Sequence, residues 1–180
     1  MRSPLNFMFS ALLLWAATAP LVQPASAHLM VAQHGTLNMV DDGVFMVLSL
    51  PVSAFAGVDD DKDGQVSMLE FNNHRADIMA SVREKVTLMD RQGAAALHGL
   101  MLSPVAPHDG TSGYLSQVTV LGRFALNDSA GALHFYVGLY GRESGERSLE
   151  ITATRASDKQ QRIFQLTPEA AAQVIFPGKA

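Results

Sequence analysis

Short segments of alternating apolar and polar residues, separated by turn-forming residues, dominate the second half of the sequence. The clearest are Tyr114–Leu126, Ala132–Tyr140 and Ser148–Arg155. The stretches between them are rich in Gly, Asn, Asp and Ser, which favour turns because they tolerate left-handed backbone or form local hydrogen bonds. A period of two is typical of strands that bury one face. Many short strands with regularly spaced turns predict a mainly β fold, and we expect an Ig-like β-sandwich.

One segment in the first half of the chain has a helical period instead. Within residues 67–83, the apolar residues Met68, Phe71, Ile78 and Val82 recur at the spacing of one helix face, with polar residues between them. We therefore expect a helix from about residue 67 to residue 83.

Strands are expected on both sides of this helix, from alternation and from short apolar runs. The expected segments are Leu29–Val40, Val44–Leu50, Val86–Asp90, Leu97–Leu102, Arg162–Leu166 and Val174–Phe176. The turn signal Asp41-Asp42-Gly43 predicts that the first two form a hairpin, and we expect the next two to pair with each other. The sequence therefore predicts one β-sandwich domain over residues 28–180, with the helix inside an insertion at about residues 51–83.

The first 27 residues have the pattern of a secretory signal peptide. Arg2 provides a positive charge, residues 11–22 are mostly apolar, and Ala25-Ser26-Ala27 matches a cleavage site. The apolar stretch is too short to cross a membrane as a helix, which takes about 20 residues. We expect a periplasmic or secreted mature chain that starts at His28 and has no membrane span.

Composition and charge argue against several classes of protein. The 180 residues include no cysteine, so the chain has neither disulfides nor thiolate metal ligands. Its 13 Lys and Arg against 17 Asp and Glu leave a net charge of −4, which argues against a nucleic-acid-binding surface. The sequence contains no His-Glu-x-x-His motif, no Gly-x-Ser-x-Gly motif and no glycine-rich phosphate loop. We therefore expect a protein that is not an enzyme and does not bind nucleic acid.

The most specific motif is a twelve-residue acidic loop, DDDKDGQVSMLE, which matches the calcium loop of an EF-hand at every diagnostic position. Ca²⁺ takes six to eight oxygen ligands, and alternating carboxylates can converge on one ion as the chain wraps around it. The expected ligands are the carboxylates of Asp59, Asp61 and Asp63, the backbone carbonyl of Gln65, Ser67 through water, and both carboxylate oxygens of Glu70. The sequence therefore predicts a single EF-hand helix–loop–helix that holds Ca²⁺ in a structural role.

Two features of this motif differ from calcium sensors. EF-hands usually occur in pairs, and the sequence contains no second match. His74 and Arg75 also stand where sensors commonly carry apolar groove residues, so no target-binding groove is expected. The helix that enters the loop has to be short, because Pro51 ends a strand shortly before Asp59.

Three parts of the sequence carry a resemblance to a known family. They are Ala27-His28-Leu29 at the expected cleavage site, Val44–Leu50 followed by Pro51-Val52-Ser53-Ala54-Phe55, and the acidic loop through Glu70. In these parts the chain resembles the extracytoplasmic N-terminal domain of HupE/UreJ-type membrane proteins, which are hydrogenase and urease accessory proteins. Members of that family continue into several transmembrane helices, and this sequence does not. The resemblance implies a soluble, stand-alone version of the domain, with a membrane protein as a candidate partner.

Two alternative functions stay open at this point. A histidine at a mature N-terminus can chelate Cu(II) through its amine and its imidazole, which suits copper. A periplasmic copper-binding protein that uses His28 is therefore one alternative, and it would need a second histidine. The candidates for that histidine are His34, His98, His108 and His134. An accessory subunit of a membrane transport complex is the other alternative, and it is compatible with either metal.

Overall fold

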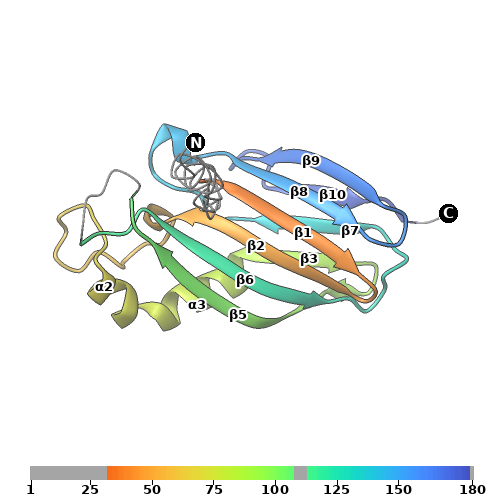
Figure 1. Cartoon of the computed structure of the whole chain (residues 1–180), viewed down its shortest axis with the longest axis horizontal. Coiled ribbons are helices and arrows are strands. Elements are labelled where there is room, and N and C mark those ends of the chain that lie inside the picture. Colours follow the sequence, from red (N-terminus) through yellow and green to blue (C-terminus); the bar gives the residue numbers. More distant parts are fainter. Residues whose placement is uncertain (1–31, 108–112, 179–180) are drawn as a thin grey trace, which may run out of the picture.

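The strands of the described residues form two β-sheets (Figure 1). The computed structural model describes residues 32–107 and 113–178. The six-stranded sheet has the order β5 (Ala96–Val105), β6 (Gln117–Ala125), β2 (Gly43–Pro51), β1 (His34–Val40), β8 (Leu149–Arg155), β9 (Gln160–Leu166). The four-stranded sheet has the order β10 (Ala172–Phe176), β7 (Leu133–Val137), β3 (Val86–Asp90), β4 (Gly93–Ala94). The expectation of a mainly β fold is confirmed. The predicted signal peptide and His28 lie outside the described residues.

The strand pairing confirms one sequence-based expectation and corrects another. The opening hairpin of β1 and β2 is present. The predicted pairing of segments 86–90 and 97–102 is wrong, because β3 pairs with β7 and with the two-residue β4, while β5 pairs with β6 in the other sheet. Neighbouring strands are antiparallel except for β1 and β8, which run parallel. Alternation along a strand indicates a buried face, but it does not indicate which strand lies beside it.

Within residues 32–107 and 113–178, four helical segments connect the strands. They are η2 (Val52–Ala54), α2 (Met68–Asn73), α3 (Arg75–Lys85) and η3 (Ser144–Glu146). The single helix predicted over residues 67–83 is divided in two at His74, whose backbone (φ −97°, ψ 10°) lies outside the helical region. The helix predicted to enter the acidic loop is reduced to the one turn of η2, because Pro51 before it and Phe55 after it are extended. None of the helices within the described residues is long and apolar enough to span a membrane.

The buried faces of the two sheets share one hydrophobic core. Along β8, every second residue is buried, as strand periodicity requires. Phe124 on β6 and Phe135 on β7 meet edge to face, with ring centroids 6.4 Å apart, and so join the two sheets. Helix α3 lies beside β3 and β5 (Figure 1) and adds Ile78 and Val82 to the core. The helical insertion is therefore anchored to both sheets.

Asp90, at the end of β3, is a buried carboxylate that organises two turns. It accepts hydrogen bonds from the backbone N–H groups of Gln92 (2.7 Å), Asn127 (2.7 Å) and Asp128 (3.0 Å). Burial raises the pKa of Asp90, but the hydrogen bonds from the backbone of Asp128, Gln92, Asn127 and Gly93 outweigh that effect and leave its pKa below the ordinary value. The charged form of Asp90 thus ties the turn after β3 to the turn after β6.

We predict that Asp90→Asn lowers the free energy of unfolding at pH 7 by about 1–3 kcal/mol, because buried N–H groups lose a charged acceptor. The pKa is depressed in the folded state, so the stabilisation is present above the unfolded pKa and is lost as pH falls through the folded one. Urea unfolding at several pH values measures the difference between wild type and variant. The difference should shrink at pH values below the ordinary aspartate pKa, and a difference that grows toward acid pH would contradict the assignment.

Candidate metal centre

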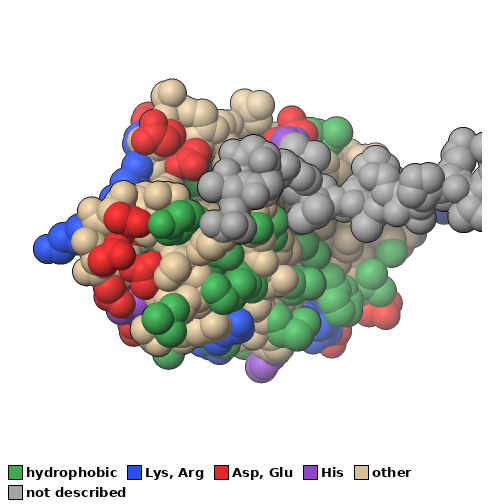
Figure 2. All heavy atoms as spheres, turned by 60° about the vertical axis from the view of Figure 1, so that its left-hand side comes forward, with side chains coloured by type: hydrophobic (Ala, Val, Ile, Leu, Met, Phe, Trp, Pro, Cys, Tyr) green, Lys and Arg blue, Asp and Glu red, His purple; other side chains and the backbone are tan. Residues whose placement is uncertain are grey.

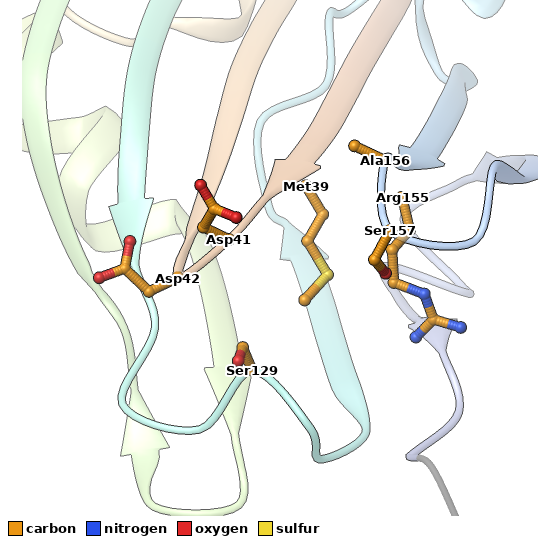
Figure 3. Close-up of a pocket in the computed structure, with 7 residues that line it drawn as sticks. All are labelled: Met39, Asp41, Asp42, Ser129, Arg155, Ala156 and Ser157. Atoms are coloured by element: carbon orange, nitrogen blue, oxygen red, sulfur yellow. The ribbon is translucent and has the colours of Figure 1, made fainter.

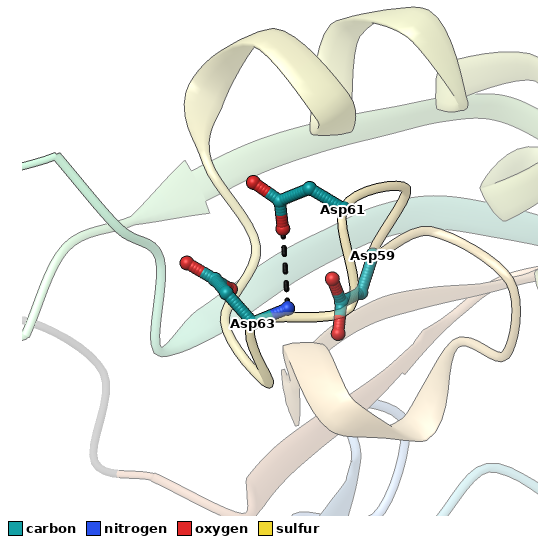
Figure 4. A group of neighbouring side chains, drawn as sticks. All are labelled: Asp59, Asp61 and Asp63. Atoms are coloured by element: carbon teal, nitrogen blue, oxygen red, sulfur yellow. Dashed lines mark hydrogen bonds between the residues drawn. The ribbon is translucent and has the colours of Figure 1, made fainter.

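Three carboxylates of the acidic loop, Asp59–Glu70, converge on one point. Asp59, Asp61 and Asp63 each present a carboxylate oxygen, and these oxygens lie within 4.8 Å of one another (Figure 4). The loop stands at one end of the molecule, between η2 and α2 (Figure 1), where Asp and Glu side chains gather on the surface (Figure 2). The structure thus brings together the three aspartates that the sequence places at alternate positions.

Backbone donors hold each of these carboxylates in place. Asp61 Oδ1 accepts from the N–H of Asp63 (3.2 Å), Asp59 Oδ2 from that of Gly64 (3.1 Å), and Asp63 Oδ1 from that of Gln65 (2.8 Å). The bend depends on left-handed backbone at Gly64 (φ 85°), which glycine adopts without strain. These bonds use one oxygen of each carboxylate, and the other oxygens are available to a cation.

The charge of this cluster is not balanced by the protein. Asp59 Oδ1 is buried and has no hydrogen-bond partner among residues 32–107 and 113–178. Within the same residues, no ion pair links Asp59, Asp61 or Asp63 to a basic side chain. An unpartnered carboxylate oxygen out of contact with water is costly unless a cation compensates it. Closely spaced carboxylate oxygens are the donors that Ca²⁺ prefers, so the residues present fit the predicted ion.

Glu70, the last residue of the loop, joins its two ends. Its Oε1 accepts from the backbone N–H of Asp60 (2.8 Å), and its Oε2 accepts from the N–H and the hydroxyl of Ser67 (both 2.8 Å). Hydrogen bonds from the backbone and side chain of Ser67 and from the backbone of Asp60 lower the pKa of Glu70 to about 2. Glu70 is only 9% exposed and stands apart from the aspartate trio. Its carboxylate is ionised and closes the loop, and its remaining lone pairs can face an ion.

The two remaining predicted ligands, Ser67 and Gln65, differ in what their side chains contact. Ser67 is the N-cap of α2 and forms a capping box with Glu70, in which each side chain bonds the other residue's backbone N–H. The Ser67 hydroxyl, which was predicted to bind the ion through water, therefore also caps the N-terminus of α2. Gln65 is exposed, as expected for a residue that contributes only its backbone carbonyl.

The acidic loop is hydrogen-bonded to the segment just before β6 by contacts that the sequence did not indicate. Leu115 N–H donates to the carbonyl of Val66 (2.8 Å), and Ser67 forms an isolated antiparallel bridge with Tyr114. Val66 and Leu115 are both buried. The segment just before β6 therefore supports the loop along its side. No local signal in the sequence links residue 66 to residue 115.

A second contact that the sequence did not indicate involves the carboxylate of Asp60, which is not among the expected ligands of the loop. His74 Nε2 lies 2.8 Å from Asp60 Oδ1, and His74 Nδ1 lies 3.4 Å from Asp77 Oδ2. These hydrogen bonds raise the pKa of His74. Because His74 stands at the junction of α2 and α3, its side chain connects the start of the loop to the helices that follow.

The histidines considered for copper lie on separate elements. His34 on β1 is paired with Glu150 (3.3 Å), His98 lies on β5, and His134 lies on β7 in the other sheet. Within the described part of the chain, the aspartate trio is the group of His, Cys, Asp and Glu side chains close enough to hold a metal ion. His28 and His108 lie outside the described residues.

Comparison with known proteins gives no match. No protein-family model matches the sequence, and neither does any curated protein. The resemblance to the HupE/UreJ-type domain therefore stays a prediction from the motifs alone.

Proposed function

We propose that the protein is a non-enzymatic, exported calcium-binding protein that holds one Ca²⁺ in an EF-hand loop inserted into an Ig-like β-sandwich. The observation that carries the proposal is the aspartate trio, whose oxygens lie within 4.8 Å while Asp59 Oδ1 is buried without a partner. Glu70 is the further ligand that would close the ion against α2, and the carbonyl of Gln65 and a water on Ser67 would complete the set.

A structural role for the ion agrees with how the loop is attached. Val66 is hydrogen-bonded to Leu115 beside β6, and the helices after the loop bury Phe71, Ile78 and Val82 in the core. Helices that swing open on calcium binding would expose these side chains to water at a large free-energy cost. The ion would instead relieve repulsion among the loop carboxylates and hold the insertion closed.

The proposed location fits the chemistry of a weak site. Extracellular calcium modules bind with dissociation constants of about 10⁻⁴–10⁻³ M, and an exported protein meets calcium near those concentrations. Cleavage after Ala27 would place the protein there, with a membrane protein of the kind suggested by the HupE/UreJ resemblance as the candidate partner.

Calorimetric titration of the metal-free protein with CaCl₂ tests the proposal. We expect one site per chain with a dissociation constant of about 10⁻⁴–10⁻³ M, and Asp61→Asn should weaken it at least about tenfold because charge count sets affinity. Glu84→Gln, a charge-matched change on an exposed position of α3, should bind like wild type. No heat of binding up to about 10 mM Ca²⁺, or equal affinity in Asp61→Asn and wild type, would refute the proposal.

A further inference from the structure

The turns that line a cavity of about 600 Å³ lie at the end of the molecule opposite the acidic loop (Figure 1). Three turns surround it: the turn between β1 and β2, the loop between β6 and β7, and the turn between β8 and β9. Its volume is within the range of small-molecule sites, about 300–1,000 Å³. The proposed calcium site does not involve any of its residues.

Polar groups stand on opposite sides of this cavity with an apolar residue between them. Figure 3 shows Asp41, Asp42 and Ser129 on one side and Arg155 and Ser157 on the other. The thioether side chain of Met39 extends between the two sides (Figure 3). A few convergent polar groups around an apolar surface are the usual composition of a ligand site.

The Arg155 side of the cavity is rigid. Arg155 is only 6% exposed, and its Nε and Nη2 donate to Asp158 (3.1 and 2.8 Å), while Nη2 also donates to Gln160 Oε1 (2.9 Å). The guanidinium also lies over the ring of Phe176, 4.7 Å from its centroid. None of these bonds uses Nη1, so the guanidinium of Arg155, which lines the cavity, retains N–H groups that can donate to an oxygen acceptor.

The opposite side of the cavity carries two exposed carboxylates, those of Asp41 and Asp42. Asp42 is paired with Arg123 (2.6 Å). The carboxylate of Asp41 has neither a hydrogen bond nor an ion pair with any residue of the described ranges. Asp41 lies in the two-residue turn with φ 52°, a conformation that Asp and Asn tolerate. An ammonium group is the natural partner for this carboxylate.

We propose that this cavity binds the α-ammonium and carbonyl group of an amino acid, either free or as the first residue of a peptide. The ammonium would pair with Asp41, the carbonyl or carboxylate oxygen would accept from Arg155 Nη1 and the Ser157 hydroxyl, and the side chain would contact Met39. The two sides of the cavity match the two ends of this group, because carboxylate oxygens on one side accept from an ammonium and N–H and O–H donors on the other side bond a carbonyl oxygen. The proposal does not depend on calcium.

Titration monitored by NMR tests the proposal with L-leucine, the peptide Leu-Gly-Gly and N-acetyl-leucine. L-leucine or Leu-Gly-Gly should bind and shift resonances of the three turns, and whichever of them binds more tightly identifies the free or the peptide form. N-acetyl-leucine lacks the ammonium and should not bind. Failure of both amine probes to bind up to about 10 mM, or equal binding of the acetylated one, would overturn the proposal.

Two variants connect the binding to the proposed residues. Asp41→Asn keeps a residue that tolerates left-handed backbone and should weaken binding at least tenfold, and Ser157→Ala should weaken it less. Glu84→Gln, which removes one negative charge far from the cavity on α3, should bind like wild type. Affinity in Asp41→Asn equal to that of wild type would also overturn the proposal. Calcium titration of the same samples measures calcium binding independently. A loss of amino-acid binding can thus be distinguished from a loss of calcium binding.

Discussion

Millimolar Ca²⁺ should raise the melting temperature of the wild-type protein by about 3–5 °C and should have almost no effect on Glu70→Gln. An ion that binds only the folded state stabilises it by RT ln(1 + [L]/Kd), about 1.4 kcal/mol at ten times Kd. For a domain of this size, that free energy corresponds to a shift of a few degrees. Thermal melts followed by circular dichroism, with chelator and with Ca²⁺, measure it.

Glu70→Gln separates metal binding from helix capping. Glutamine at this position still satisfies the capping-box pattern with Ser67, but it removes the negative charge and one of the two carboxylate oxygens. In chelator, the variant and the wild type should melt at similar temperatures, because relief of carboxylate repulsion offsets the lost acceptor.

Asp60→Asn is the matched control for this experiment, since Asp60 carries the same charge but bonds His74 rather than facing the trio. It should keep nearly the full calcium response. An equal calcium shift in wild type and Glu70→Gln would show that the acidic loop is not the site.

Phe71→Ala should lower the free energy of unfolding by about 3–5 kcal/mol, the usual cost of deleting a buried aromatic ring. Phe71 follows Glu70 directly in α2, is fully buried, and has the Arg75 guanidinium 5.0 Å from its ring centroid. Helix α2 has only six residues, so packing rather than helix propensity stabilises it. The loss of this ring should therefore release α2 from the core.

Leu69→Ala provides the comparison for Phe71→Ala on the same helix. Leu69 is 71% exposed, so its truncation should change the free energy of unfolding by no more than about 0.5 kcal/mol. Urea unfolding followed by circular dichroism measures both variants, because Trp15, the single tryptophan, lies in the predicted signal peptide. Equal destabilisation by the two substitutions would contradict the burial of Phe71 as the contact that holds α2 on the core.

The elements that depend on neighbouring residues could be predicted from the sequence. β3 has the predicted bounds, residues 86–90, because its apolar residues alternate and Arg91-Gln92-Gly93 ends it. β8 and the opening hairpin of β1 and β2 follow from the same local signals. The convergence of Asp59, Asp61 and Asp63 was also predictable, because the three residues lie within one short loop.

Other features depend on residues far apart in the chain, and no local pattern indicates them. The helix break at His74 accompanies hydrogen bonds of its side chain to Asp60 and to Asp77. The cavity beside Arg155 forms only where three separate turns meet.

The sequence by itself determined where most strands lie, which faces they bury and which loop gathers carboxylates, because these properties repeat over a few residues. Only the tertiary structure decided that β5 pairs with β6 in the six-stranded sheet and not with β3 in the other sheet. It also decided that β1 and β8 run parallel and that the backbone of Leu115 donates a hydrogen bond to Val66. The physical reason is that an alternating strand can bury its apolar face in either sheet and beside several neighbours. The choice among these arrangements comes from packing both sheets around one core, to which the whole chain contributes.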